Sequence, residues 1–377
     1  MNIPVTKPVF GDAEINAVAE RLRSGWVVQG PQVAEFEKRW AEFVGARFAR
    51  ATTSCTTALH LALLGIGIGA GDEVIVPAFT WIATANVVEY CGAQPVFADI
   101  DLQTFNLDPA QIENKITART KAILPVHEFG LSADMDALLA IARRHNLRVV
   151  EDGACACGTR YRGQHVGTFG EVGCFSFHPR KAITTGEGGM LTTNDEALAQ
   201  LFEVLRSHGA ETSDLARHTS NAGFILPEFN RLGFNYRMTD IQGAIGVEQM
   251  KRLDGILAQR RARAHRYTAR LQNVPGIILP REPDGYTHVY QSYVILIQAG
   301  HTARDHIALT LKAKGIATRQ GTHAVHALGY YCAQYGLTPD DCPQAWRADQ
   351  ESLTLPLYAT MTDAEQDYVI DALRELV

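Results

Sequence analysis

Residues 149–189, VVEDGACACGTRYRGQHVGTFGEVGCFSFHPRKAITTGEGG, hold two short apolar runs that each lead into chemically reactive side chains. The first run ends at Glu151 and Asp152, and the second passes through a proline to Lys181 and a loop rich in threonine and glycine. Because side chains alternate along a strand, one carboxylate is expected to face a site and the other to face away. Ligands bind at the carboxyl ends of strands in open α/β sheets. The stretch therefore predicts a carboxylate and an amine at the edge of such a sheet.

The same kind of apolar run recurs through the first two thirds of the chain, in alternation with helical patterns. Strands are expected at 73–77, 95–99, 121–126, 148–152, 173–177 and 190–193, and helices at 56–65, 81–90, 135–145 and 196–208. This alternation is typical of βαβ units. Several runs are apolar on both faces, which predicts a mostly parallel sheet covered by helices on both sides.

The remainder predicts a smaller unit of different character. A long charged helix is expected over 238–271, then a strand at 290–297, a helix at 303–314 and a final helix after Thr362, with the least regular loops at 213–230 and 338–346. We therefore expect an α/β protein with a large domain at 1–245 and a smaller C-terminal α+β domain at 246–377.

The composition of the chain disfavours several classes of function. With 377 residues, 46% hydrophobic and 20% charged, the chain is typical of a globular protein with a full-sized core. A net charge of −6 without a basic run disfavours nucleic-acid and anionic-membrane binding. No signal core and no run of about 18 apolar residues occurs, so neither secretion nor a membrane span is expected. Seven cysteines, an odd number, predict reduced thiols in a cytoplasmic protein. Cys155 and Cys157 lack a second pair nearby, so no metal site is expected.

Two further segments offer groups that bind a ligand. Residues 51–61, ATTSCTTALHL, predict a strand end, a hydroxyl-rich turn and a helix N-terminus, which binds phosphate unless Ser54 is only an N-cap. Trp81 follows a predicted strand and suits either stacking on a planar ring or the core. Taken singly, Asp152 could cap a helix and Lys181 could be a surface charge. Together, an amine, a carboxylate, an anion-binding turn and an aromatic face are what pyridoxal 5′-phosphate requires.

The chain resembles a known family over nearly its whole length. The resemblance rests on GDEVIVPAFTWIATANVV (71–88), PVFADID (95–101), RTKAILPVHEFG (119–130), the 149–189 stretch and GFNYRMTDIQGAIG (233–246). In this order, these segments resemble the fold-type I, pyridoxal-phosphate-dependent sugar aminotransferases of the DegT/DnrJ/StrS group.

The resemblance implies roles for residues around the cofactor ring. Lys181 would form the internal aldimine, Asp152 would pair with the pyridine nitrogen, and Trp81 would stack on the ring. The family often has glutamine or histidine where this chain has Cys155. A thiol is a weaker hydrogen-bonding group, so Cys155 would contact the ring hydroxyl only weakly at the family's usual polar position.

The resemblance also implies how the phosphate is held. Cys55 and Thr56, at the family's small-residue–threonine turn, would bind it together with Ser176. Glycine or alanine is commoner than cysteine at position 55, but a backbone N–H contact would survive that change. Asn235 would reach the phosphate of a neighbouring subunit, which implies a homodimer with shared active sites.

Lys181 favours amino transfer, because relatives that remove a hydroxyl have histidine there. The implied reaction moves an amino group from an amino acid, glutamate by resemblance, to a nucleotide-linked keto-sugar. The loop at 183–189 resembles enzymes that act at C4 of a 4-keto-6-deoxyhexose. A C3 sugar aminotransferase, a cyclitol aminotransferase and a non-catalytic sensor that keeps the cofactor as a ligand are the alternatives. Candidates for substrate contact, each equally suited to a structural role, are His178, Glu187, His323 and His326.

Overall fold

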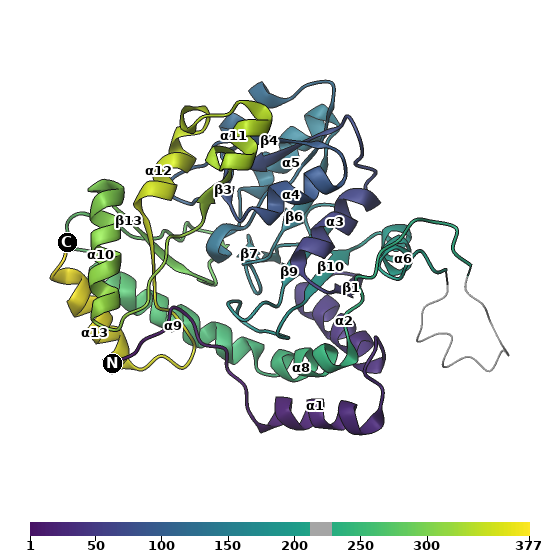
Figure 1. Cartoon of the computed structure of the whole chain (residues 1–377), viewed down its shortest axis with the longest axis horizontal. Coiled ribbons are helices and arrows are strands. Elements are labelled where there is room, and N and C mark those ends of the chain that lie inside the picture. The colour runs from purple at the N-terminus through teal and green to yellow at the C-terminus, as the bar shows by residue number, and fades with distance from the viewer. Residues whose placement is uncertain (212–227) are drawn as a thin grey trace.

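The computed structural model describes residues 1–211 and 228–377, and its larger part is built on a seven-stranded sheet (Figure 1). The strand order is β1-β10-β9-β6-β5-β2-β4. The strands are β1 (Phe48–Thr52), β2 (Glu73–Pro77), β4 (Gln94–Ala98), β5 (Thr120–Ile123), β6 (Arg148–Asp152), β9 (Val172–Ser176) and β10 (Gly189–Thr193). Strands from β9 to β4 pair in parallel, whereas β10 is antiparallel to both of its neighbours. The expected mostly parallel, mixed sheet is confirmed.

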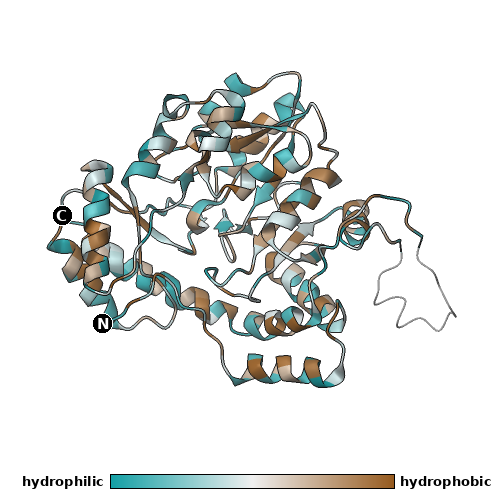
Figure 2. Cartoon of the chain, in the orientation of Figure 1, coloured by the Kyte–Doolittle hydropathy of each residue, from teal (hydrophilic) through white to brown (hydrophobic). Residues whose placement is uncertain are grey.

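Helices cover this sheet on both faces, as the two-sided apolar runs predict. Val74 and Val76 of β2 pack in one cluster with α3 (Cys55–Gly65), while Ile75 packs in another with α5 (Met135–His145). The helices α4 (Ala83–Tyr90) and α6 (Glu196–Leu205) lie on the α3 side. In Figure 2 the strands are mostly brown, whereas outer helices carry both teal and brown, as amphipathic helices do.

Two N-terminal helices that the sequence analysis did not predict pack against the start of the expected long helix. They are α1 (Asp12–Ser24) and α2 (Pro31–Val44), and both contact α8 (Asp240–Met250). The buried carboxylate of Asp240 accepts hydrogen bonds from the N–H groups of Gln32 (2.8 Å) and Val33 (3.0 Å). It thereby satisfies donors in the first turn of α2 that have no partner within the helix.

The prediction of one continuous helix over 238–271 is wrong. The segment forms α8 and then α9 (Leu253–Leu271), with a break at Lys251 and Arg252. Arg252 has φ −110° and ψ −4°, outside regular helix geometry, and its guanidinium donates to the buried Glu14 of α1 at 2.9 Å. This long-range ion pair accompanies the break, and the hydrophobic pattern of the helix carries no signal for it.

The C-terminal part forms a separate antiparallel sheet of three strands. It consists of β11 (Ile277–Ile278), β13 (Tyr293–Ile297) and β15 (Ser352–Leu355), packed with α9, α10 (Gly300–Ala313) and α13 (Asp363–Arg374). The predicted strand and both predicted helices in this region are confirmed. Ile3 also belongs to this core, so the N-terminus returns to it (Figure 1). The proposed division at residue 245 falls within α8 and remains a prediction.

Only one of the two loops expected to be irregular, 338–346, lies wholly within the described residues. Residues 212–227, most of the first loop, lie outside the described residues. The second loop is more regular than expected, because it contains a 3₁₀ turn (Pro339–Asp341) and the start of α12 (Pro343–Glu351). Asp99, which follows β4, accepts hydrogen bonds from the N–H groups of Gln344 and Ala345 and so caps α12 from a distant part of the chain. None of the helices in the described ranges combines the length and the apolar character needed to cross a bilayer.

Candidate active site

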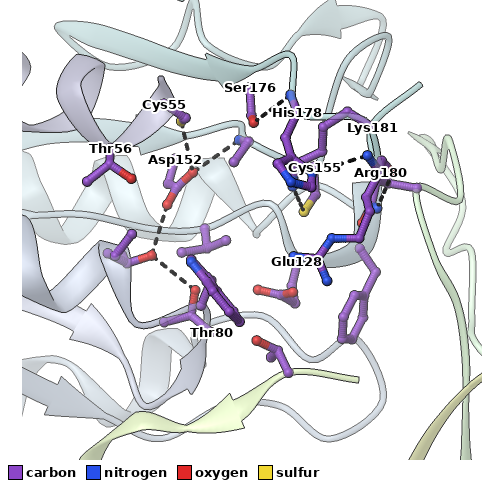
Figure 3. A pocket seen from close by; sticks show the side chains of 18 of the residues that line it. Cys55, Thr56, Thr80, Glu128, Asp152, Cys155, Ser176, His178, Arg180 and Lys181 are labelled. Atoms are coloured by element: carbon purple, nitrogen blue, oxygen red, sulfur yellow. Dashed lines mark hydrogen bonds between the residues drawn. The ribbon is translucent and has the colours of Figure 1, made fainter. Parts of the chain in front are cut away.

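A cavity of about 280 Å³ opens at the carboxyl ends of β6 and β9 (Figure 3). Residues from both predicted domains line it, including Gln291 and Arg319 of the C-terminal part. The residues of the sequence-predicted site that lie on this cavity are Cys55, Thr56, Trp81, Asp152, Cys155, Ser176, His178, Lys181 and Glu187. The fold therefore brings most of the predicted site together from five separate segments.

Asp152, the last residue of β6, presents its carboxylate to the cavity. Its Oδ2 accepts a hydrogen bond from the Thr84 hydroxyl (2.9 Å), and its Oδ1 accepts one from the Ala154 N–H (3.0 Å). The side chain is buried, and no cation within the described ranges lies at ion-pair distance from it. Burial raises the pKa of Asp152 above its usual value. A cationic group on a ligand would stabilise this carboxylate.

Glu151, its neighbour in sequence, points to the other face of the strand, as the alternation predicts. Its carboxylate accepts hydrogen bonds from the N–H groups of Gly167, Phe169 and Gly170 and from Nε2 of His127 (3.0 Å). Burial alone would raise the pKa of Glu151, but these hydrogen bonds outweigh it and hold the pKa below its usual value. Glu151 therefore fixes the loop that precedes β9 and does not line the cavity.

Lys181 reaches the same cavity from the turn that follows β9. Its backbone N–H donates to the carbonyl of His178 (2.8 Å), which closes the turn around the intervening proline. Its Nζ lies 3.2 Å from Sγ of Cys155 and has no carboxylate within ion-pair distance among the residues described (Figure 3). The amine is half-buried and faces the cavity that Asp152 also faces.

The turn before α3 lies on the same cavity. Ser54 is the N-cap, and its hydroxyl accepts a hydrogen bond from the Thr57 N–H (3.2 Å), which leaves the N–H groups of Cys55 and Thr56 without an acceptor inside the helix. A side chain at Gly189 of β10 would clash with the backbone of Ser54, so β10 holds the turn closely. The Cys55 thiol is directed at Asp152 Oδ1 (3.9 Å), and the backbone N–H groups remain for an anion.

Trp81 lies at the mouth of the cavity and is 53% exposed, which excludes a core role. Its ring lies 5.8 Å from the guanidinium carbon of Arg180 and 5.8 Å from the ring of His323. Neither His323 nor His326 lines the cavity, and His326 is fully buried against Phe97.

Two other predicted contact residues, His178 and Asn235, lie in different surroundings. His178 lines the cavity beside Glu187, and burial lowers the pKa of His178. Asn235 is exposed, and its backbone pairs with that of Ser207 in an isolated β-bridge. It does not line the cavity of its own chain. Its predicted contact with a second subunit therefore remains a prediction.

The sequence analysis missed several residues of this cavity, among them Thr84, Glu128, Gln291 and Arg319. Glu128 follows the predicted strand at 121–126 by two residues, so the strand-end argument that identified Asp152 would have found it. Thr84 and Arg319 come close to Asp152 and Lys181 only because of the sheet order and the docking of the C-terminal part. No local pattern marks them.

These groups fit pyridoxal 5′-phosphate. The buried, unpaired carboxylate of Asp152 matches a protonated pyridine nitrogen, and the amine of Lys181 matches an aldehyde. The N–H groups of Cys55 and Thr56, with the hydroxyl of Ser176, match a phosphate.

Comparison with known proteins agrees with this geometry. The model of the DegT/DnrJ/EryC1/StrS aminotransferase family matches residues 8–374. The spore coat polysaccharide biosynthesis protein SpsC of Bacillus subtilis is 43% identical over 378 residues, covering 100% of this chain and 97% of that protein. GDP-perosamine synthase of Caulobacter vibrioides is also 43% identical over 378 residues, covering 100% and 98%.

Solved structures give the same result. Spr1654 of Streptococcus pneumoniae matches in its PMP form with a TM-score of 0.94 and in its PLP form with 0.93, each at 29% identity. The two matches cover 100% of this chain and 99% and 98% of the solved chains. A structural neighbour is thus known in two forms of the same cofactor that the groups of this cavity suit. The chain belongs to the DegT/DnrJ/EryC1/StrS aminotransferase family and is a pyridoxal-phosphate-dependent sugar aminotransferase.

Proposed function

We propose that the enzyme moves an amino group from glutamate to C4 of a nucleotide-linked 4-keto-6-deoxyhexose. The name of one relative specifies a GDP-linked product, and that of another a polysaccharide pathway, which supports a nucleotide-linked sugar as substrate. The loop at 183–189 supports the C4 position by its resemblance to C4 enzymes, and its Glu187 lies on the cavity.

One observation carries the proposal: the Lys181 amine and the Asp152 carboxylate face a single cavity that also receives the first turn of α3. When bound, pyridoxal phosphate supplies an aldehyde and an electron-withdrawing ring. Lys181 Nζ, with no ion pair to hold it among the described residues, is free to take a proton from the α-carbon of the amino acid and to return one to the sugar carbon.

Asp152 acts in this scheme as a fixed negative charge. The Thr84 hydroxyl and the Ala154 N–H hold its two oxygens in place, so the carboxylate does not reorganise during proton transfer. Glu151 and His127 contribute indirectly, because their buried hydrogen bond fixes the strand end that carries Asp152.

Two arginines supply positive charge to the substrate side of the cavity. Arg180 lies beside Trp81, and Arg319 is held by its hydrogen bond to the Gly321 carbonyl (3.2 Å). Burial and the charge of Arg180 lower the pKa of Arg319, so an anion between the two guanidinium groups would be favoured. The carboxylate of the amino donor and the diphosphate of the sugar nucleotide are the anions that this reaction brings.

We further propose that two copies form a dimer in which Asn235 of each contacts the phosphate site of the other. Exposed apolar side chains near Asn235, Phe229 (59% exposed) and Leu232 (87% exposed), support burial of this segment against a second copy.

The test is a panel of nucleotide-linked keto-sugars, each offered with glutamate and with other amino acids as controls. Mass spectrometry reports which sugar gains an amino group, and NMR of the product assigns the carbon. Amination at C4 of a 4-keto-6-deoxyhexose with glutamate is the expected result. Amination at C3, or of a cyclitol, would contradict the proposed substrate and leave the enzyme class intact.

A further inference from the structure

A second buried carboxyl group lies in the cavity, and the scheme above does not use it. Glu128 is 4% exposed and lines the cavity together with Lys181 and Cys155 (Figure 3). Its carboxyl oxygens make no hydrogen bond and no ion pair with any described residue; only its backbone N–H is bonded, to Asn106 Oδ1 at 2.9 Å. Neither oxygen is among the fully sealed side-chain atoms, so both are open to the cavity and free to bind a ligand there.

The backbone that carries Glu128 is held from both sides. The preceding His127 accepts from the Ala133 N–H (3.1 Å) through Nδ1 and donates to Glu151 through Nε2. The following Phe129 has φ +52°, a left-handed conformation that is strained for an aromatic residue. Strain of this kind persists only where the surroundings over-determine the backbone. The backbone of Glu128 is therefore held in place, and its side chain lines the cavity.

The charged and titratable groups that face Glu128 come from three other segments. They are Asp152, Lys181, Arg319 and Cys155. Burial and then the charge of Asp152 raise the pKa of Glu128 to about 8, against which Lys181 and Arg319 act in the opposite direction. At neutral pH the group is thus a carboxylic acid, which donates one hydrogen bond and accepts others.

The position of Cys155 indicates which atom of the cofactor would accept a hydrogen bond from Glu128. Its thiol lies 3.2 Å from Lys181 Nζ, so it occupies the wall of the cavity next to the amine. The atom of pyridoxal phosphate next to the reactive aldehyde is the ring hydroxyl oxygen, and a thiol is only a weak donor to it. Glu128 is the unpartnered carboxyl group that lines the same cavity as this amine, and its raised pKa favours the protonated form.

We propose that Glu128, as a neutral acid, donates a hydrogen bond to the ring hydroxyl oxygen of bound pyridoxal phosphate and supplies the polar contact that Cys155 cannot. The inference rests on the cofactor site and is independent of the identity of the sugar. Glu128 would then lower the pKa of the Lys181 nitrogen when that nitrogen is bound to the cofactor. A hydrogen bond donated to the ring oxygen makes this oxygen a weaker acceptor for the proton on the neighbouring nitrogen.

The test compares Glu128→Leu, which removes the donor, with Glu128→Gln, which keeps a donor of similar size. Cofactor affinity is measured by titration, and the visible absorbance band of each loaded protein is titrated with pH. Loss of a hydrogen bond to a charged oxygen is expected to weaken binding on the order of tenfold in Glu128→Leu and to raise the midpoint of the band by about one pH unit. Glu128→Gln is expected to stay near the wild type in both.

The midpoint decides the outcome. An unchanged midpoint in Glu128→Leu overturns the proposal even if affinity falls, because damaged packing also lowers affinity. If Glu128→Leu does not fold, affinity is compared between wild type and Glu128→Gln from pH 6 to 9.5. The wild type is expected to lose affinity above about pH 8, where Glu128 loses its proton, and the variant is expected to lack that component. Identical profiles would overturn the proposal.

Discussion

Glu151 and Asp152 are neighbours in sequence, yet their carboxylates face opposite sides of β6 and have opposite electrostatic surroundings. Backbone N–H groups and His127 surround Glu151, and its pKa lies below the usual value. Asp152 has fewer donors and no ion-pair partner within the described part of the chain, and burial raises its pKa. One carboxylate is thus stabilised by the protein, and the other requires a bound cation.

Asp152→Asn should therefore retain the fold and lose the reaction. An amide cannot balance a protonated ring nitrogen, and removal of such a preorganised contact costs on the order of 100-fold in rate. The measurement is the single-turnover rate with a saturating amino donor, with cofactor content checked in the same sample. A rate near that of the wild type would mean that the carboxylate has only a structural role.

Glu151→Gln should have the opposite profile and destabilise the protein. The amide replaces one of the two carboxylate oxygens by an NH2 group, which would leave two of the four buried donors without an acceptor, at a cost of about 3 kcal/mol in the free energy of unfolding. Urea denaturation of the cofactor-free protein measures this, with Asp152→Asn as the matched control that relieves a buried charge. Equal stability of the two variants would contradict the assignment of the two carboxylates.

The stability of the cofactor-free protein should also report the proton on Glu128. The pKa of Glu128 is about 8 in the folded protein and near 4.5 in the unfolded chain. Between pH 4.5 and pH 8, the folded protein therefore holds a proton that the unfolded chain has released. The free energy of unfolding should fall as pH rises through this window, by about 5 kcal/mol relative to Glu128→Gln. Parallel profiles for the two proteins would show that Glu128 ionises normally.

The predictable and unpredictable parts of this fold differ in the range of the interactions that set them. Strands such as β6 and β9 match their predicted bounds within one residue, because a short two-sided apolar run is a local signal. The break between α8 and α9, and the start of α12, depend on Glu14 and Asp99, which lie far away in the sequence. Such contacts have no local signature.

The cavity shows the same division. Asp152 ends β6 and Lys181 lies in the turn that follows β9, where chain position alone suggests a role. Thr84 becomes a partner of Asp152 only through the order of strands in the sheet. Glu128 follows a predicted strand closely, so its place near the site could have been predicted from chain position, although no distinctive motif surrounds it.

The shared-site dimer predicts complementation between two inactive proteins. Asn235→Ala impairs the partner's phosphate site and Lys181→Ala impairs its own, so a mixed dimer would hold one site with both lesions and one intact site. Mixing the two proteins should restore up to about a quarter of wild-type activity if subunits exchange at random. Demonstrated exchange of labelled subunits without recovery would count against a shared site.

Lys181 is the amine expected to bind the cofactor aldehyde, because its Nζ faces the cavity without an ion-pair partner among the described residues. Borohydride reduction of the loaded protein, followed by peptide mapping, tests it most directly, because reduction makes the bond between lysine nitrogen and cofactor carbon permanent. We expect a pyridoxyl group on the peptide that contains Lys181, and neither that label nor a visible absorbance band in Lys181→Ala. Labelling of a different lysine, or no label on wild-type protein that retains the cofactor, would contradict it.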